Sequence, residues 1–345
     1  MLNKWAGRAP QVVETLYARK FFKSVNLPLS MVTGLFPISI AEFVLIGLIV
    51  FLIVRGFKTV MHFKQHKEKR KQIVVTIIAN TLIMVSVINI AFILLWGLNY
   101  SRLPFADMSG LEIKPTSAVE LGELNQSLIV QANALRSTVE EDARGVFRIS
   151  RGRDSVFNNA QVGFTNASDV YPQLGGMYGR PKGVMLSTLM SYAGISGVYF
   201  PFTAEANVNV AIPDVVLPST TCHEMSHQRG FAREDEANFL AYVTCLVHPD
   251  PDFQYSGTLL ALMHAMSALR KYDQETYLQL RQEYGEGLKR DLADLGRFWE
   301  QYEGPFERLS NRINDTYLKA NGQEDGVQSY GRMVDLLLAA RRSSK

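Results

Sequence analysis

Two long apolar runs constrain this chain more than any other feature of its sequence. Residues 73–98 carry no charged side chain, and residues 35–54 carry only one, Glu42, near one end where a carboxylate can reach water. A helix needs about 20 apolar residues to cross the hydrocarbon core of a bilayer, because each residue adds about 1.5 Å. The sequence therefore predicts two transmembrane helices rather than two core helices of a soluble protein.

Charge is distributed unevenly around these runs. Residues 1–72 contain 12 Lys and Arg against 3 Asp and Glu, whereas the rest of the chain contains 24 against 30. The basic excess peaks in the predicted loop 55–72, and short basic loops stay on the cytoplasmic side. Both chain ends are then expected outside the cytoplasm. This pattern indicates a lipid bilayer as partner and gives no sign of a nucleic-acid partner.

Three parts follow from this topology. Residues 1–34 form an amphipathic segment that is expected to lie along the membrane interface. Residues 35–98 hold the two transmembrane helices, and residues 99–345 form an extracytoplasmic domain. The sequence leaves the oligomeric state of this arrangement open.

Periodicity predicts that the outer domain is mainly α with a small sheet, in the α+β class. Ser117 and Glu120 have the spacing of a helix capping box. Residues 143–182 are rich in Gly, Asn, Arg and Tyr, which predicts loops and short strands there. The alternation in residues 207–217 predicts one strand. Residues 257–341 have helical periodicity with two breaks.

The motif that carries chemistry is HExxH, residues 223–227. His223 and His227 are four residues apart, so on a helix both imidazoles project from one face and can bind one ion. Zinc accepts neutral imidazole, and catalytic zinc sites keep one position open for water. Glu224 lies about 100° round the helix from His223, where it can act as the general base for that water.

A catalytic zinc site needs a third protein ligand. After a predicted helix stop at Gly230, a second helical run begins with Glu234, Asp235 and Glu236. Residues two apart lie about 200° apart on a helix, so Glu234 and Glu236 cannot both face the metal. We expect Glu234 to be the ligand, because it shares its face with Asn238, which could hold a ligand by hydrogen bonding. Glu236 is the alternative.

Several further residues are candidates for substrate or oxyanion contacts. The donors considered for the oxyanion are Tyr199, Tyr330 and Arg332. Asn207 and Asn209 share one face of the predicted strand, which could bind a peptide by edge pairing or could be an ordinary core strand.

Three other sets of residues are expected to be structural. Cys222 and Cys245 are the only cysteines, and we expect two buried thiols rather than a disulfide. His264 lies in an apolar helical run, where we expect a core histidine rather than a ligand. Trp96 and Tyr100 fit an interfacial aromatic belt at the exit of the second apolar run.

Four blocks of this sequence carry a resemblance to a known family. They are LLWGLNYSRLP (94–104), GVYFPFTAEANVN (197–209), HEMSHQRGFAREDEANFLAY (223–242) and VQSYGRMVDLLLA (327–339). The chain resembles, over nearly its whole length, the uncharacterised bacterial membrane proteins of domain-of-unknown-function family 3810. The resemblance implies a location in the bacterial cell membrane. The resemblance gives little further information about a mechanism, because the family's activity is itself inferred from HExxH.

The segment from Glu234 to Asn238 is also similar to the ExxxD/N element of gluzincin proteases. That resemblance implies a zincin-like domain in which the first Glu is the third zinc ligand and the last residue supports a histidine. Only six residues separate His227 from Glu234, which is fewer than in many gluzincins.

These features together predict a membrane-anchored zinc metallopeptidase with one Zn²⁺ ion and a peptide or protein substrate in the cell envelope. The alternative is a non-catalytic zinc-binding sensor or structural module of the envelope. The substrate itself is not encoded in any motif.

Overall fold

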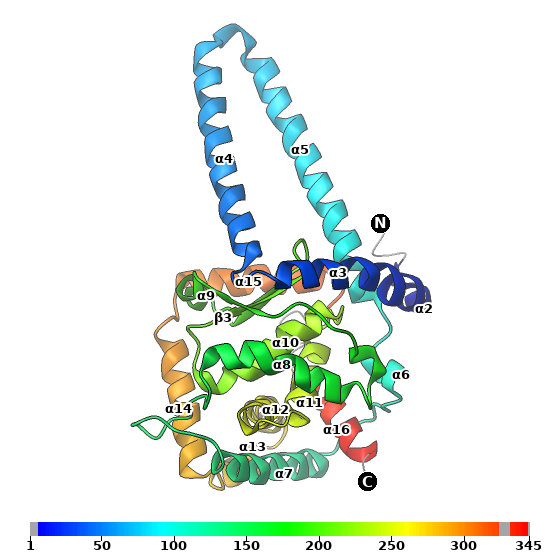
Figure 1. Cartoon of the computed structure of the whole chain (residues 1–345), viewed down its shortest axis with the longest axis vertical. Helices are drawn as coiled ribbons and strands as arrows, with labels where there is room; N and C mark the ends of the chain where they lie inside the picture. Colours follow the sequence, from blue (N-terminus) through cyan, green and yellow to red (C-terminus); the bar gives the residue numbers. More distant parts are fainter. Residues whose placement is uncertain (1–5, 324–331, 344–345) are drawn as a thin grey trace.

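A computed structural model of the chain describes residues 6–323 and 332–343. Two long helices project from one end of a mostly helical domain that contains a small sheet (Figure 1). The N-terminal segment, the long helices and the domain follow one another along the chain. The mainly α class with a small sheet is therefore confirmed.

The N-terminal segment is helical and lies across the end of the domain from which the long helices rise (Figure 1). It consists of α2 (Pro10–Val12), η1 (Val13–Phe22) and α3 (Lys23–Gly34), and η1 has π-helical hydrogen bonding. Asn26 in α3 donates a hydrogen bond to the carbonyl of Gln228, so this segment packs on the domain.

The projecting pair is α4 (Ile40–Gln65) and α5 (Arg70–Leu95). Both helices are long and apolar enough to cross a membrane, which confirms the two helices predicted from the apolar runs. A helix of 26 residues is about 39 Å long, longer than the ~30 Å hydrocarbon core of a bilayer.

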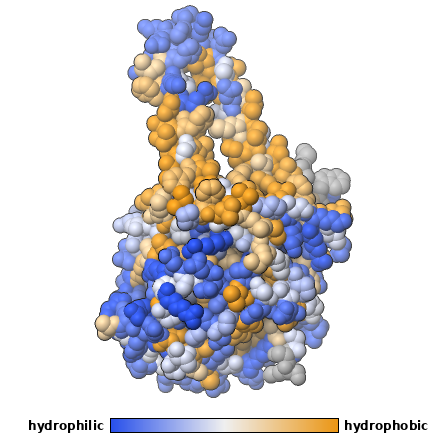
Figure 2. Space-filling view, in the orientation of Figure 1, coloured by the Kyte–Doolittle hydropathy of each residue, from blue (hydrophilic) through white to orange (hydrophobic). Residues whose placement is uncertain are grey.

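The predicted loop 55–72 is mostly helical. Helix α4 continues to Gln65, and only His66 and the single turn η2 (Lys67–Lys69) separate it from α5. Lys and Arg are good helix formers, and no proline interrupts this stretch, so the helices extend beyond their apolar parts. The side chains at this tip form a hydrophilic cap on an otherwise apolar pair of helices (Figure 2).

Glu42 does not reach water, contrary to the expectation from its position near a helix end. It is buried in the first turn of α4, where its carboxylate accepts hydrogen bonds from the main-chain N–H groups of Met185 and Leu186. The carboxylate therefore ties α4 to the domain.

The remaining helices build the domain. They are η3 (Gly97–Ser101), α6 (Phe105–Ser109), α7 (Ala118–Arg136), α8 (Arg153–Ala167), η4 (Pro172–Leu174), α9 (Ser187–Tyr192), η5 (Asp214–Val216), α10 (Leu217–Gln228), α11 (Glu234–Leu246), α12 (Pro251–Tyr272), α13 (Gln274–Arg281), α14 (Glu286–Glu300), α15 (Pro305–Ala320) and α16 (Met333–Ser343). The capping box of Ser117 and Glu120 is present at the start of α7, as predicted.

Helix α8 corrects the prediction of loops and short strands for residues 153–167, whereas most of the remainder of residues 143–182 forms loops as predicted. Its buried face includes the small residues Ala160, Gly163 and Ala167, which hide a helical period from a pattern search based on large apolar side chains. Gly163 allows close approach, because a Cβ there would lie 2.3 Å from the carbonyl oxygen of Thr244 in α11. At Gly163, α8 thus packs closely against α11 without a side chain between them.

The sheet has three strands, β1 (Lys182–Val184), β2 (Gly197–Phe200) and β3 (Glu205–Asn209), in the order β1-β3-β2. Strand β1 pairs with β3 in parallel, and β2 pairs with β3 antiparallel, with Tyr199 opposite Ala206. Strand β3 is central and buried along its whole length. Strand β2 lies at the edge of the sheet.

The central position of β3 overturns the edge-pairing role considered for Asn207 and Asn209. Both edges of β3 are already paired. Asn207 accepts a hydrogen bond from Ser39, and Asn209 donates to Ser191 and to the carbonyl of Ile195. Both amides bind the protein itself, so they are unavailable to a substrate.

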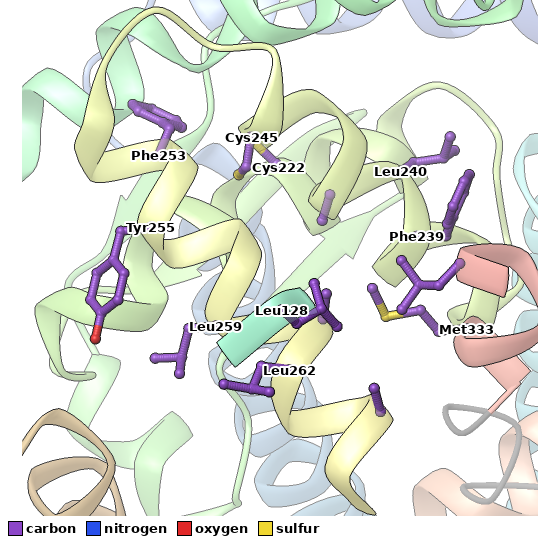
Figure 3. Close-up of a cluster of buried hydrophobic side chains, with 14 of the residues drawn as sticks. Leu128, Cys222, Phe239, Leu240, Cys245, Phe253, Tyr255, Leu259, Leu262 and Met333 are labelled. Carbon is purple, nitrogen blue, oxygen red and sulfur yellow. The ribbon is translucent and has the colours of Figure 1, made fainter. Parts of the chain in front are cut away.

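The core lies between α10, α11 and α12, with α7 and α8 packed around them. Figure 3 shows part of it, including Leu128, Phe239, Leu259 and Met333. Cys222 and Cys245 lie in this core and are unbonded, which confirms the expectation of two buried thiols. The core holds together α10, which carries HExxH, and α11, which begins at Glu234.

Candidate metal centre

A sharp turn after α10 brings the next helix back against it. Gly230 adopts a left-handed conformation with φ of 85°, and its N–H donates to the carbonyl of His227. A Cβ at this position would lie 2.8 Å from the ring of Phe22, so a side chain is excluded by space as well as by conformation. Helix α11 then begins at Glu234, beside the HExxH helix.

His223, His227 and Glu234 form a cluster of potential metal ligands. One donor atom from each lies within 4.8 Å of the others. The Oε2 atom of Glu234 is 3.2 Å from Nε2 of His223 and 3.6 Å from Nε2 of His227. Two imidazoles and one carboxylate therefore converge on one point, with geometry that a single ion can use.

In each imidazole, Nδ1, the ring nitrogen that does not face Glu234, is hydrogen-bonded to an oxygen. Nδ1 of His223 lies 2.8 Å from Oδ1 of Asn238, and Nδ1 of His227 lies 2.6 Å from the carbonyl oxygen of Phe231. Because these oxygens accept hydrogen bonds, both Nδ1 atoms donate. This leaves both Nε2 atoms directed at Glu234, the arrangement that ligand histidines adopt around a metal.

The charges in the cluster are strongly coupled. Burial alone would lower the pKa of His227, but the carboxylate of Glu234 outweighs it and raises that pKa to about 9. Burial would likewise raise the pKa of Glu234, but the charges of His227 and His223 lower it. Positive charge at this point therefore stabilises the ionised carboxylate, as a bound cation also would.

Glu224 lies beside the cluster, against the edge strand. Burial raises the pKa of its carboxyl group, although the two histidines act in the opposite direction. A Cβ at Gly197 would lie 2.5 Å from Oε1 of Glu224, so the carboxylate occupies the space that any side chain at this position of β2 would fill. Among the described residues, Oε2 of Glu224 has no hydrogen-bond partner.

Glu236 points away from the cluster. Its Oε1 accepts a hydrogen bond of 2.7 Å from the main-chain N–H of Phe105 and lies 3.5 Å from Nε of Arg233. Burial raises its pKa to about 7. Of the two glutamates considered as third ligand, only Glu234 therefore lies with the histidines.

Comparison with known proteins places this whole unit in one family. The family described as "Protein of unknown function (DUF3810)" matches residues 17–338. The chain belongs to the DUF3810 family. The match includes both long helices and the cluster of His223, His227 and Glu234. No protein in the curated collection matches the chain, and no solved structure matches it.

The side chains considered as oxyanion donors in this DUF3810 chain bind other groups or lie outside the described part. The hydroxyl of Tyr199 donates to Oδ1 of Asn26, whereas its main-chain N–H donates to the carboxylate of Glu224. Nε of Arg332 lies 3.7 Å from Asp235, on the side of α11 that faces α16. Tyr330 is outside the described residues. The hydroxyl of Tyr199 and the guanidinium of Arg332 thus contact groups other than the two histidines.

Aromatic residues that the sequence did not single out for the site surround it instead. Trp96 is buried, and its ring lies 5.7 Å from that of His227. Trp96 and Tyr100 both donate to the hydroxyl oxygen of Tyr317, at 3.2 and 3.1 Å. Trp96 is therefore part of the domain's own packing rather than an exposed aromatic belt.

Tyr100 and Tyr317 lie close enough to the cluster for the charge of Glu234 to affect their pKa values. Burial raises the pKa of Tyr100 and of Tyr317, and the carboxylate of Glu234 adds to both shifts. Both phenols therefore keep their protons at neutral pH; Tyr100 donates its proton to Tyr317, and the proton of Tyr317 is left to donate to another group. Tyr100 falls in one of the four DUF3810 blocks, whereas Tyr317 carries no signal in the sequence.

His264 also lies nearer the centre than its apolar surroundings indicate. It is half-buried on α12, and burial together with the charge of His223 lowers its pKa to about 4. His264 is not a member of the ligand cluster. It presents a neutral imidazole near the ligands.

Proposed function

We propose that this DUF3810 protein is a membrane-anchored zinc metallopeptidase acting on peptides or proteins of the cell envelope. The observation that carries the proposal is the convergence of His223, His227 and Glu234 with Glu224 buried beside them. Two histidines and a glutamate form one of the ligand sets of catalytic zinc peptidases, and they leave a position open. These four side chains come together in the protein without a bound substrate.

The donor set fits the ion. Both imidazoles offer Nε2 while Nδ1 is held by an oxygen, and Glu234 offers a carboxylate oxygen. Two histidines and one carboxylate also bind iron in some enzymes, so metal analysis decides between the two ions. The HExxH spacing on one helix supports zinc.

The surrounding side chains have separate roles in this mechanism. Zinc, when bound, would lower the pKa of water toward ~7 and polarise the scissile carbonyl. Glu224 accepts the proton of the attacking water and passes it to the leaving amine, and its burial favours holding a proton between these transfers.

Substrate contacts are assigned to two other places. The phenol of Tyr317 is the donor that we assign to the oxyanion, because its oxygen accepts from Trp96 and Tyr100 while its own proton is left to donate, and the charge of Glu234 acts on it. An extended peptide would pair with β2, the edge strand against which Glu224 lies.

The side of the membrane on which the domain lies follows from charge. The basic residues between Arg55 and Lys71 gather at the far tip of the helix pair, and such clusters stay in the cytoplasm. The domain and both chain ends are then extracytoplasmic. A topology reporter fused after Lys345 should behave as extracytoplasmic, and a cytoplasmic signal would refute this orientation.

The activity is tested with the full-length protein purified in mild detergent. Metal content and cleavage of a diverse peptide library are compared for the wild type, Glu224→Gln, Glu234→Gln and Glu236→Gln. We expect zinc and cleavage in the wild type, zinc without cleavage in Glu224→Gln, and loss of both in Glu234→Gln. Glu236→Gln is the matched control, because its side chain faces away from the cluster and keeps an acceptor for Phe105.

The outcomes separate the two functions considered. Zinc bound by the wild type without cleavage of any peptide would favour the sensor or structural module. A wild type that contains no metal and takes up none would refute both.

A further inference from the structure

Three segments far apart in the sequence lie at the end of the domain from which α4 and α5 rise (Figure 1). They are the N-terminal segment η1–α3, the short helix α9 and helix α15. We call the outward surface of these segments the membrane-proximal face. Its chemistry differs from that of an ordinary protein surface.

Helix α15 shows this difference most directly. Three of its large apolar side chains, Phe306, Leu309 and Ile313, are 59%, 54% and 62% exposed, whereas Leu318 in its last turn is buried. Its polar residues Glu307, Ser310 and Asn314 are half-buried, and Glu307 packs over Gly194. A surface helix in water has the opposite arrangement, with its apolar stripe toward the core. Helix α15 is therefore oriented for an apolar environment outside the protein.

Contacts with α4 and α5 place the face at the ends of the two candidate spans. Tyr317 of α15 packs edge-on against Phe92 in the last turn of α5 and receives the hydrogen bond of Trp96, just after that helix. Tyr17 of η1 donates to the carbonyl of Leu94. Glu42 in the first turn of α4 accepts from Leu186, next to α9. All three segments therefore lie level with the boundary of the spans.

The other two segments also present apolar side chains outward. These are Leu16, Phe21, Val25, Met31, Val32 and Leu35 in η1–α3 and beside it, and Met185, Leu186 and Leu189 in and beside α9. Figure 2 shows that apolar surface continues from the helix pair onto the adjoining end of the domain. On α15, the apolar stripe is flanked by exposed Arg308, Arg312 and Lys319, a composition typical of helices that lie in a bilayer interface.

We propose that the membrane-proximal face is seated in the bilayer interface, with α15 as a second interfacial helix besides the N-terminal segment. The occupant is lipid rather than a partner protein, because the face is continuous with the exposed apolar surface of α4 and α5. The apolar stripe enters the acyl boundary, and the flanking basic residues reach the headgroups.

This seating holds the metal centre at the membrane surface. Trp96 directly follows α5, and its ring is 5.7 Å from that of His227. If the proposed peptidase function holds, the substrate segment must reach the bilayer surface, as the juxtamembrane part of a membrane-anchored protein does. The lipid contact itself does not depend on the metal.

The contact is tested by fluorescence quenching on the full chain in vesicles of phosphatidylethanolamine and phosphatidylglycerol. An environment-sensitive thiol label is attached to Leu309→Cys and, in a second variant, to Ile313→Cys. Both native cysteines are fully buried and leave the label selective. The matched control is Val130→Cys, which is 61% exposed on α7 at the opposite end of the domain.

We expect doxyl-labelled phospholipid to quench the labels at 309 and 313 several-fold more strongly than the label at 130. Iodide on both sides of the vesicle should show the reverse order. Iodide quenching at 309 and 313 equal to that at 130 would overturn the proposal. Labels that neither quencher reaches would mean that protein, such as a second copy of the chain, covers the face, and would overturn it too.

A second experiment tests whether the proposed metal centre lies at the bilayer surface. It uses a library peptide that the reconstituted enzyme cleaves, and compares cleavage of this peptide with and without an attached acyl chain. Preference for the acylated form supports a site at the bilayer surface. Equal rates would reject that consequence while leaving the peptidase function and the lipid contact intact.

Discussion

The hydrogen bond between Asn238 and His223 offers a quantitative test of the metal centre. Oδ1 of Asn238 lies 2.8 Å from Nδ1 of His223, and the asparagine side chain is buried on α11. This bond holds the imidazole in the tautomer that would present Nε2 to the proposed ion. Asn238→Ala removes it without touching any ligand, whereas the corresponding partner of His227 is a main-chain carbonyl and cannot be deleted by substitution.

The expected loss can be worked out from the role of such partners. Deleting a hydrogen-bond partner of a ligand histidine typically costs about 10–100-fold in metal affinity. That range corresponds to about 1.4–2.7 kcal/mol of binding free energy. Asn238→Asp keeps an acceptor at the same place and adds charge, so its affinity should be equal to or higher than that of the wild type.

The assay is competition for zinc between the purified full-length protein and a chelating dye. Thermal unfolding of the metal-free proteins serves as the control for folding, because the substituted side chain is buried. If metal-free Asn238→Ala unfolds like the wild type and binds zinc equally tightly, the hydrogen bond does not orient the ligand. The assignment of His223 as a ligand through Nε2 would then be refuted.

Three further predictions concern the base, the core and the N-terminal segment. Gly197→Ala should abolish peptide cleavage while zinc remains bound, because the new Cβ would lie 2.5 Å from Oε1 of Glu224. Gly296→Ala is the control, because the space around Gly296 is open. Unchanged turnover in Gly197→Ala would contradict the placement of Glu224. Leu259→Ala should lower the free energy of unfolding by about 2–5 kcal/mol, since this residue is fully buried in the core, and denaturant titration measures the loss; a loss within experimental error would contradict that burial. Burial acts to raise the pKa of Glu14, but Arg102 and Arg19 outweigh it and lower that pKa. The ionised carboxylate therefore stabilises the fold at pH values above its unfolded pKa, and this stabilisation is lost as the pH falls through its folded pKa. The difference in melting temperature between the wild type and Glu14→Gln should therefore shrink below about pH 4.5, the ordinary pKa of a glutamate, and a difference that stays constant on acidification would contradict this.

Features that depend only on residues close together in the sequence could be predicted from the sequence alone. The two apolar runs predict the long helices, because spanning a bilayer requires only length and hydropathy along one segment. The spacing of His223 and His227 places both imidazoles on one helix face, whatever surrounds that helix. Gly230 predicts the helix stop, because a left-handed conformation is a property of one residue.

Features that depend on the path of the chain were decided by the tertiary structure. The direction of α11 after Gly230 places Glu234, and not Glu236, beside the histidines. The pairing of β3 on both edges removes Asn207 and Asn209 from any substrate role. Trp96 and Tyr317 meet beside the ligands although 221 positions separate them. Helical periodicity reveals the apolar stripe of α15, but only packing shows that the stripe faces outward. A local pattern records which side chains share a face, whereas their partners depend on contacts between segments that the pattern does not contain.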